Sequence, residues 1–181
     1  MRVIAGLAKG RRLLGPRGGE TRPMTDRARE GLFSSLGAAV EGARVLDLYA
    51  GTGSLGLEAL SRGGRSATFV ERGRAALAAL RANVAAVGLG GEVVAGDAAA
   101  YVAGPAGGPF DLVFVDPPYA LALASVEQVL GALVRLLAGG AVVVLHRRAG
   151  EGLTPPPGLE VADRRRYGDS EITRLVKEGA P

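Results

Sequence analysis

The feature that most constrains the fold is a regular alternation of short apolar segments with helix-length segments from Arg44 onward. Apolar segments of this length are typical of buried strands, and the stretches between them have helical composition. Because successive strands separated by helices must cross over, the alternation predicts an α/β fold with a mostly parallel sheet covered on both faces. The predicted strands are 45–49, 66–70, 91–95, 111–115 and 141–145, and the predicted helices are 54–62, 74–87, 98–102 and 122–137.

The C-terminal part of the chain departs from this rhythm. After the proline-rich loop 153–158, two apolar segments at 159–165 and 171–176 are joined by the Tyr167-Gly168-Asp169 turn. Two strands joined by a tight turn form a hairpin, so we expect an antiparallel C-terminal hairpin at the edge of the sheet.

The N-terminal part predicts a small extension. Segments 2–5 and 11–14 can pair around a turn at Lys9-Gly10, and 25–40 has the pattern of a helix with Thr25 as its N-cap. We therefore predict two parts, which are a basic N-terminal hairpin and helix extension over 1–40 and the main domain over 41–181.

Composition narrows the class of protein. The chain has 181 residues, of which 48% are hydrophobic, so it can bury one domain-sized core. No apolar run approaches the roughly 18 residues of a membrane span, and the N-terminus lacks the apolar core of a signal peptide. The absence of cysteine excludes disulfides and thiolate metal sites, and the single histidine, His146, cannot form a metal cluster alone. We expect a cytoplasmic monomer that contacts no membrane and holds no metal.

Positive charge is concentrated at the N-terminal end. Residues 1–36 carry eight Lys or Arg against three Asp or Glu, whereas the remainder of the chain is nearly neutral. Such an arm suggests a polyanionic partner such as RNA or DNA, because phosphate neutralisation supplies most sequence-independent affinity, although a merely solvated arm explains the charge equally well. The candidate RNA-binding residues are Arg2, Lys9, Arg11, Arg12 and Arg27.

A glycine-rich segment follows the first predicted strand of the main domain. Gly51, Gly53 and Gly56 have the G-x-G-x-x-G spacing that lets a backbone approach a ligand closely. Asp47 precedes the glycines, where it can meet a cationic amino-acid group, and Glu71 ends the next strand, where a carboxylate can accept hydrogen bonds from a ribose. Because nicotinamide dinucleotides and S-adenosylmethionine both carry such a ribose, the spacing alone leaves both cofactors open.

Carboxylates end four of the predicted strands: Asp47, Glu71, Asp97 and Asp116. Each alone has an ordinary explanation as a helix cap or turn residue. Together they line the carboxyl edge of the sheet, where open α/β folds bind ligands. An acidic edge disfavours a pyrophosphate and favours a cationic cofactor without phosphate. Asp97 is placed where it could accept a hydrogen bond from the exocyclic amine of an adenine.

The segment Asp116-Pro117-Pro118-Tyr119 follows the fourth predicted strand. Two prolines remove two backbone donors, so the turn offers mainly acceptors, namely the Asp116 carboxylate and the Pro117 carbonyl. Acceptors that hold both hydrogens of an exocyclic amine make its nitrogen more nucleophilic, and Tyr119 offers a face on which a base can stack. The simpler alternative is a rigid turn that only ends a strand.

In these motifs the chain resembles amino-methylating, S-adenosylmethionine-dependent methyltransferases, and more narrowly the RsmD-like bacterial 16S rRNA guanine-N2 methyltransferases. The D-P-P-Y segment indicates only the reaction class, whereas the Thr-Arg-Pro…Arg-Glu block is the most specific to the narrower family. The resemblance covers nearly the whole chain and rests on 2–6, 10–13, 21–30, 32–33, 47–56, 58–63, 116–119 and 166–169.

The resemblance implies a Rossmann-like class I methyltransferase fold, S-adenosylmethionine as cofactor, and a guanine of 16S rRNA in the assembling or assembled small ribosomal subunit as substrate. It implies catalytic roles for Asp116, Pro117, Pro118 and Tyr119. The implied cofactor-binding residues are Asp47, Tyr49, Gly51, Thr52, Gly53, Glu71, Arg72, Asp97, Ala98, Arg22, Pro23 and Met24. Two positions depart from the pattern: Met24 replaces a small hydroxyl residue, and His146 stands where an acidic residue commonly closes the fifth strand.

Four other functions compete with this interpretation. A DNA adenine-N6 methyltransferase uses the same D-P-P-Y chemistry, but this chain has little room for a target-recognition domain. A protein glutamine methyltransferase more typically has Asn at position 116. A noncatalytic RNA-binding protein leaves D-P-P-Y unexplained, and a nicotinamide dehydrogenase leaves the acidic edge unexplained.

Overall fold

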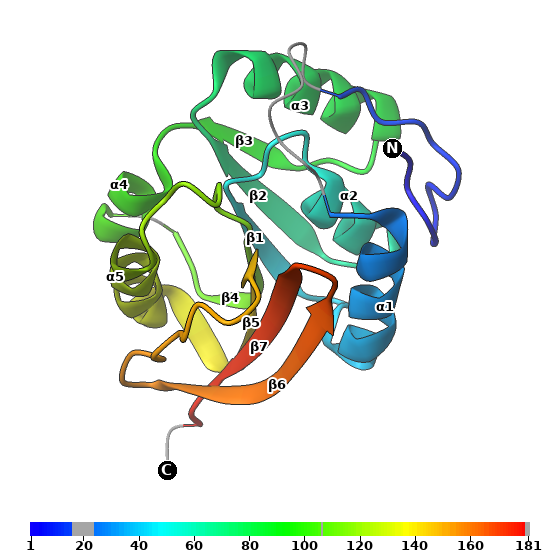
Figure 1. The fold of residues 1–181 in the computed structure, drawn as a ribbon. Coiled ribbons are helices and arrows are strands. Elements are labelled where there is room, and N and C mark those ends of the chain that lie inside the picture. The colour runs from blue at the N-terminus through cyan, green and yellow to red at the C-terminus, as the bar shows by residue number, and fades with distance from the viewer. Residues whose placement is uncertain (16–23, 106, 180–181) are drawn as a thin grey trace.

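The computed structural model describes residues 1–15, 24–105 and 107–179. These residues form a seven-stranded sheet in the order β3-β2-β1-β4-β5-β7-β6, with helices on both faces (Figure 1). Strands β1 to β5 are parallel, and β7 runs antiparallel to both of its neighbours. The strands are β1 Arg44–Leu48, β2 Ser66–Glu71, β3 Glu92–Ala95, β4 Phe110–Val115, β5 Leu137–Arg148, β6 Leu159–Tyr167 and β7 Ser170–Lys177.

Two apolar layers sandwich the sheet. Successive strand residues point to opposite faces, so Val45 packs with one layer and Leu46 with the other. The first layer lies under α1, α2 and α3, and the second under α4 and α5. The helices are α1 Asp26–Leu36, α2 Ser54–Ser61, α3 Arg74–Val87, α4 Ala98–Ala103 and α5 Leu123–Leu133, with 3₁₀ turns η1 Gly37–Ala39 and η2 Val134–Leu136. No helix in these described ranges is long and apolar enough to cross a bilayer.

The predicted α/β fold with an antiparallel C-terminal hairpin is confirmed. The largest error concerns β5, which we predicted over 141–145 and which begins at Leu137 and ends at Arg148. It starts early because Leu137 pairs with Phe110 of β4, which also ends the preceding helix sooner than predicted. It ends late because β7 supplies hydrogen-bonding partners as far as Arg148.

The N-terminal extension is simpler than predicted. Thr25 caps α1 as expected, since its hydroxyl accepts from the Ala28 N–H at 3.2 Å. The helix ends at Leu36 rather than Val40, because Gly37 adopts a φ of 50° and the chain continues as a 3₁₀ turn. Instead of two extended strands, the first residues form a single antiparallel bridge between Arg2 and Arg12.

Candidate active site

Two loops meet where the strand order reverses. β1 and β4 are neighbours in the sheet, yet β1 continues on one side to β2 and β4 on the other side to β5. Leu48 pairs with Val115, so the glycine-rich loop after β1 and the D-P-P-Y turn after β4 begin side by side. Open α/β sheets bind ligands at such a reversal, at the carboxyl ends of the strands.

The glycine-rich loop has a backbone that few side chains tolerate. Gly51 and Gly53 have φ values of 57° and 83°, and Tyr49 has a φ of 61° despite its side chain. A Cβ on Gly56 would lie 2.4 Å from Cε1 of Phe69, whereas one on Gly51 would meet nothing within 4 Å. Gly56 is therefore needed for packing against β2, and Gly51 leaves open space on the outer side of the loop.

Asp47 lies beneath this loop and is almost fully buried, with 1% of its surface exposed. Its Oδ2 accepts a hydrogen bond from the Gly56 N–H at 2.9 Å. Burial raises the pKa of the Asp47 carboxyl well above its usual value; the charges of Asp116 and Glu71 add to this rise, and the Gly56 hydrogen bond opposes it. In this structure Asp47 holds the start of α2 against β1.

Glu71 connects the glycine-rich loop to the turn after β2. Its Oε2 accepts from the Gly51 N–H at 2.7 Å. Its Oε1 accepts from the N–H groups of Gly73, at 2.6 Å, and Arg72, at 2.9 Å. An ionised carboxylate offers about four acceptor positions, so the described residues leave one for a hydroxyl group at the edge of the sheet.

Asp97 combines two roles at the end of β3. Its Oδ1 caps α4 by accepting from the N–H groups of Ala99 and Ala100, at 2.9 and 3.2 Å. Its Oδ2 lies 3.2 Å from Nη1 of Arg72, whose side chain is largely exposed, whereas that of Asp97 is partly exposed. Asp97 is therefore the N-cap of α4 and also lies on the acidic edge of the sheet.

Three of the other residues predicted to hold the cofactor are buried. Thr52, Ala98 and Met24 are 7%, 3% and 7% exposed, respectively. Met24 packs in the core layer under α1. The predictions for Arg22 and Pro23 lie outside the described residues.

The D-P-P-Y turn presents its first and last side chains at the surface. Asp116 has 30% of its side chain exposed, and its Oδ1 lies 2.8 Å from Nδ1 of His146. Tyr119 is 36% exposed, and its ring centroid lies 6.0 Å from that of His146. The guanidinium of Arg148 lies 5.3 Å from the centre of the Tyr119 ring, close enough for a cation–π contact.

Arg147 fixes the far end of the same turn from a buried position. It is 5% exposed and donates to the carbonyl oxygens of Pro118 and Leu121, at 3.0 and 2.9 Å. Its charge is balanced by Glu151, whose Oε2 lies 2.7 Å from Nε. The last three residues of β5 thus all contact the D-P-P-Y segment or the loop that follows it. Sequence reasoning missed them because it ended the strand at Leu145, although His146 already stood out as a departure from the family pattern.

Buried polar residues on α2 and α3 hold the N-terminal arm. Glu58 accepts from the N–H groups of Ile4 and Ala5, at 2.7 and 3.1 Å. Asn83 donates to the carbonyl oxygens of Leu14 and Thr52, at 3.1 and 3.0 Å. The arm is therefore docked on the main domain, and Asn83 joins it to the glycine-rich loop. A polar residue inside an Ala/Leu-rich helix was the available sequence signal.

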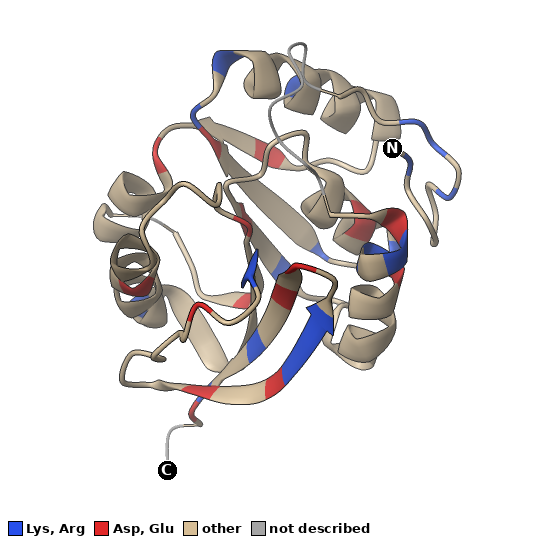
Figure 2. Ribbon diagram, viewed as in Figure 1, with Lys and Arg blue, Asp and Glu red and all other residues tan. Residues whose placement is uncertain are grey.

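Lys and Arg residues are spread over much of the chain, and two places hold several of them, the N-terminal arm with the start of α1 and the end of β6 (Figure 2). The arm and the start of α1 carry the five predicted RNA-binding residues, and all five are exposed. The second place is the end of β6, where Arg164, Arg165 and Arg166 are exposed. We did not predict this run as a nucleic-acid contact.

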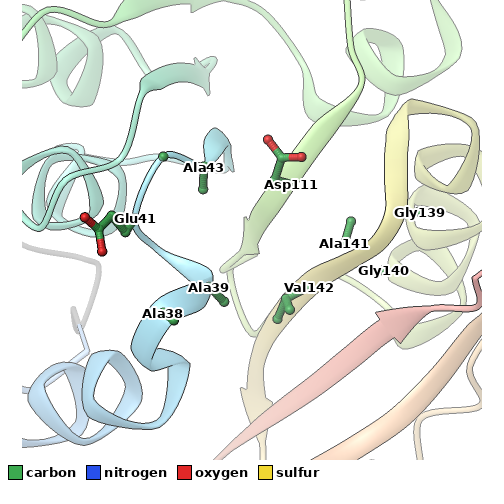
Figure 3. Close-up of a pocket in the computed structure, with 10 residues that line it drawn as sticks. Ala38, Ala39, Glu41, Ala43, Asp111, Gly139, Gly140, Ala141 and Val142 are labelled. Carbon is green, nitrogen blue, oxygen red and sulfur yellow. The ribbon is translucent and has the colours of Figure 1, made fainter.

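A shallow hollow of about 330 Å³ lies at the opposite edge of the sheet (Figure 3). Its lining is mostly small residues, together with Glu41 and Asp111. Asp111 is paired with Arg44, with Nε to Oδ2 at 2.8 Å, and this pairing lowers the pKa of its carboxyl. The hollow adjoins the start of β1 and β4, so it lies away from both loops of the candidate site.

Comparisons with known proteins agree with this geometry. The model of the family described as Conserved hypothetical protein 95 matches residues 1–176. A putative rRNA methyltransferase, YlbH of Bacillus subtilis, is 35% identical over 99% of this chain and 100% of its own length. Ribosomal RNA small subunit methyltransferase D of Escherichia coli K12 is 35% identical over 99% of this chain and 91% of its own. The solved structure of the putative methyltransferase yhhF from Escherichia coli superposes with a TM-score of 0.87, at 35% identity and 99% coverage of both chains.

Proposed function

The chain belongs to the Conserved hypothetical protein 95 family, the RsmD family, and from this membership we propose that it methylates the exocyclic N2 amine of a guanine in 16S rRNA. Methyl transfer to ribosomal RNA is the activity named for its curated relatives, which match nearly its whole length. The guanine amine and the assembling or assembled small subunit are the finer parts of the proposal.

The residues of the glycine-rich loop fit S-adenosylmethionine as the methyl donor. The open space beside Gly51 admits a ligand, and Glu71 sits directly behind the loop with an acceptor position to spare for a ribose hydroxyl. Asp97 stands at the next strand end and is partly exposed. The carboxylates suit a cofactor that has a net positive charge and carries no phosphate.

The hydrogen-bond acceptors of the D-P-P-Y turn support the proposal that the methyl group is transferred to an amine. Among hydrogen bonds between described residues, none is made to Oδ2 of Asp116 or to the carbonyl oxygen of Pro117. These two oxygens are therefore available to the two hydrogens of an amine, beside the loop that we assign to the cofactor. Tyr119, which is partly exposed, provides a surface on which the base can stack.

The chemistry required of the protein is mainly positioning. When bound, the sulfonium cofactor supplies a methyl group that its positive charge has already activated. Asp116 and Pro117 then align the amine nitrogen for in-line attack and stabilise the positive charge that develops on it. Attack forms the N–CH₃ bond and breaks the S–CH₃ bond, and the surplus proton leaves the nitrogen for Asp116 or solvent. The chain contains no cysteine, and direct transfer needs no covalent enzyme intermediate.

The D-P-P-Y turn by itself indicates only that an amine is methylated. The choice of guanine over adenine rests on the resemblance of the chain to the RsmD-like guanine-N2 methyltransferases. The exposed basic residues of the docked arm fit a phosphate-rich partner, and the small size of the chain favours recognition of a folded subunit over naked RNA.

Asp116→Ala is the direct test of the proposed site. We expect it to abolish transfer while cofactor affinity changes little, because Asp116 lies on the acceptor side of the site. Labelled S-adenosylmethionine should be incubated with small subunits, free 16S rRNA and duplex DNA, and the digested products resolved by nucleoside. Asp163→Ala, which removes a carboxylate on β6, serves as the matched control.

The product pattern separates the possible outcomes. N2-methylguanosine from small subunits, lost in Asp116→Ala and kept in Asp163→Ala, supports the proposal. N6-methyladenine as the only product would replace it with the adenine alternative. Transfer at the wild-type rate by Asp116→Ala would remove Asp116 from the site.

A further inference from the structure

We propose that His146 is a positioning residue that holds one oxygen of Asp116 and thereby fixes the other as the acceptor for the substrate amine. This inference rests on the proposed function, since it assigns a partner to Asp116 in the same site. The geometry that points to it is the 2.8 Å contact between Nδ1 of His146 and Oδ1 of Asp116.

The D-P-P-Y turn offers its aspartate few local backbone donors. An Asp at the end of a strand ordinarily accepts a hydrogen bond from a backbone N–H of the next residues, as Asp97 does with Ala99 and Ala100. Pro117 and Pro118 have no N–H, so the donors one and two residues after Asp116 are missing, and among the described residues the N–H of Tyr119 makes no hydrogen bond to the Asp116 carboxylate. A donor from another part of the fold is therefore needed to fix the carboxylate, and His146 occupies that place.

The sheet keeps His146 in position. β5 is paired on both sides near this point, with Leu145 opposite Val115 of β4 and His146 opposite Ile172 of β7. The His146 side chain is only 7% exposed, whereas that of Asp116 is 30% exposed. A buried donor on a paired strand thus meets a carboxylate that faces outward, which suits a support placed behind a substrate-contacting group.

The hydrogen bond also determines the form of the imidazole. An ionised carboxylate can only accept, so a neutral His146 must carry its proton on Nδ1. In this arrangement Oδ1 is engaged from behind and Oδ2 is left free for the amine. Arg147 fixes the other end of the turn through the carbonyl oxygens of Pro118 and Leu121. Neighbouring residues of β5 therefore fix both the aspartate and the segment that follows it.

The tautomer can be measured directly, because His146 is the only histidine in the chain. We expect ¹⁵N NMR of the imidazole-labelled protein, recorded over a series of pH values, to show the Nδ1–H form wherever the ring carries a single proton. Asp116→Ala removes the acceptor and should shift the population toward the Nε2–H form. A predominantly Nε2–H tautomer in the wild-type protein would overturn the inference without any measurement of activity.

Kinetics test whether the contact matters for transfer. His146→Leu removes the donor, whereas His146→Asn places an amide nitrogen at the same covalent distance from the backbone as Nδ1. We expect His146→Leu to lower kcat on small subunits by about 10- to 100-fold, the usual effect of losing a hydrogen bond to a charged group, with an unchanged KM for the cofactor. His146→Asn should restore most of kcat.

The outcomes distinguish this inference from the function on which it rests. A wild-type kcat in His146→Leu, or an equal loss in His146→Asn and His146→Leu, would overturn the positioning role. Either result would leave the proposed function intact provided that Asp116→Ala is inactive. An active Asp116→Ala variant would instead overturn the proposed function itself. If His146→Leu fails to fold, the NMR measurement on the wild-type protein still decides the question.

Discussion

The two halves of the carboxyl edge hold their carboxylates in different ways. On the side of β1, β2 and β3, the partners of Asp47 and Glu71 are backbone N–H groups of the first turn of α2, the glycine-rich loop and the turn after β2. On the side of β4 and β5, Asp116 is held by the side chain of His146, which lies 30 residues further along the chain. The carboxylates of the first half are thus held mainly by backbone N–H groups, with one exposed side-chain contact between Asp97 and Arg72, whereas the carboxylate of the second half is held by a side chain.

This difference predicts which substitutions each half tolerates. A loop held through its own N–H groups depends on backbone conformation and on glycines that admit close approach. A turn held by side chains from a neighbouring strand depends on the identity of those side chains. Substitutions can therefore be chosen that damage one half and leave the other intact.

The largest effect is expected for a substitution in the first half, which should weaken cofactor binding. Glu71→Ala removes the acceptor for Gly51 and, in the proposed site, for the cofactor ribose. Hydrogen bonds to charged groups contribute about 1.5–3 kcal/mol, so we expect the Kd for S-adenosylhomocysteine to rise by roughly 10- to 100-fold. Calorimetric titration measures this change in Kd. The control is Glu92→Ala, which removes a carboxylate at the start of β3, away from the carboxyl edge of the sheet. An unchanged Kd would contradict the assignment of the first half to the cofactor.

The next effect concerns the backbone of the first half. Gly56→Ala would place a Cβ 2.4 Å from Cε1 of the buried Phe69, so we expect a loss of about 1–3 kcal/mol in the free energy of unfolding. Urea denaturation measures this loss. The control is Gly96→Ala on the same edge, where a Cβ would meet nothing within 4 Å. Equal stability of the two variants would show that the loop can shift to relieve the clash.

A third test uses the pH dependence of stability. Burial raises the pKa of Asp47, so the folded state binds that proton more tightly than the unfolded state does. Stability from this group is therefore present at low pH and is lost as the pH rises from the ordinary carboxyl range through the raised value. Asn in place of Asp47 can still accept from the Gly56 N–H but does not titrate. We expect the free energy of unfolding of Asp47→Asn to decline less with rising pH than that of the wild type, and parallel curves would refute this.

The smallest expected effect belongs to the second half. Arg148→Ala removes the cation beside the Tyr119 ring, and an exposed cation–π contact contributes about 0.5–1 kcal/mol. We expect a few-fold rise in the KM for small subunits, measured in the transfer assay, without a change in the Kd for the cofactor. Arg81→Ala, which removes an exposed charge on α3, is the control for net charge. A rise in cofactor Kd for Arg148→Ala would show that the second half also affects cofactor binding and would contradict the division of the site.

The same division explains how much of the site could be predicted. Glycine spacing and strand-terminal carboxylates are local features, so the sequence identified Gly51, Gly56 and Glu71 and the edge on which they lie. The predicted contact of Asp47 with a ligand is less direct in the structure, because its burial depends on how tightly α2 packs on β1 and β2. Similarly, a polar residue inside an apolar helix was a local signal, but it did not indicate that Glu58 and Asn83 would contact the N-terminal arm.

The sequence by itself determined the α/β architecture, the succession of strands and helices along the chain, and the scarcity of backbone donors in the D-P-P-Y turn. These features depend on periodicity and on the covalent structure of proline. Only the tertiary structure decided what holds that turn. β5 extends beyond its apolar core because β7 pairs with it as far as Arg148, and this extension brings His146 to Asp116. Such a contact joins residues on different strands, so its geometry is set by the register of the sheet and not by any local segment.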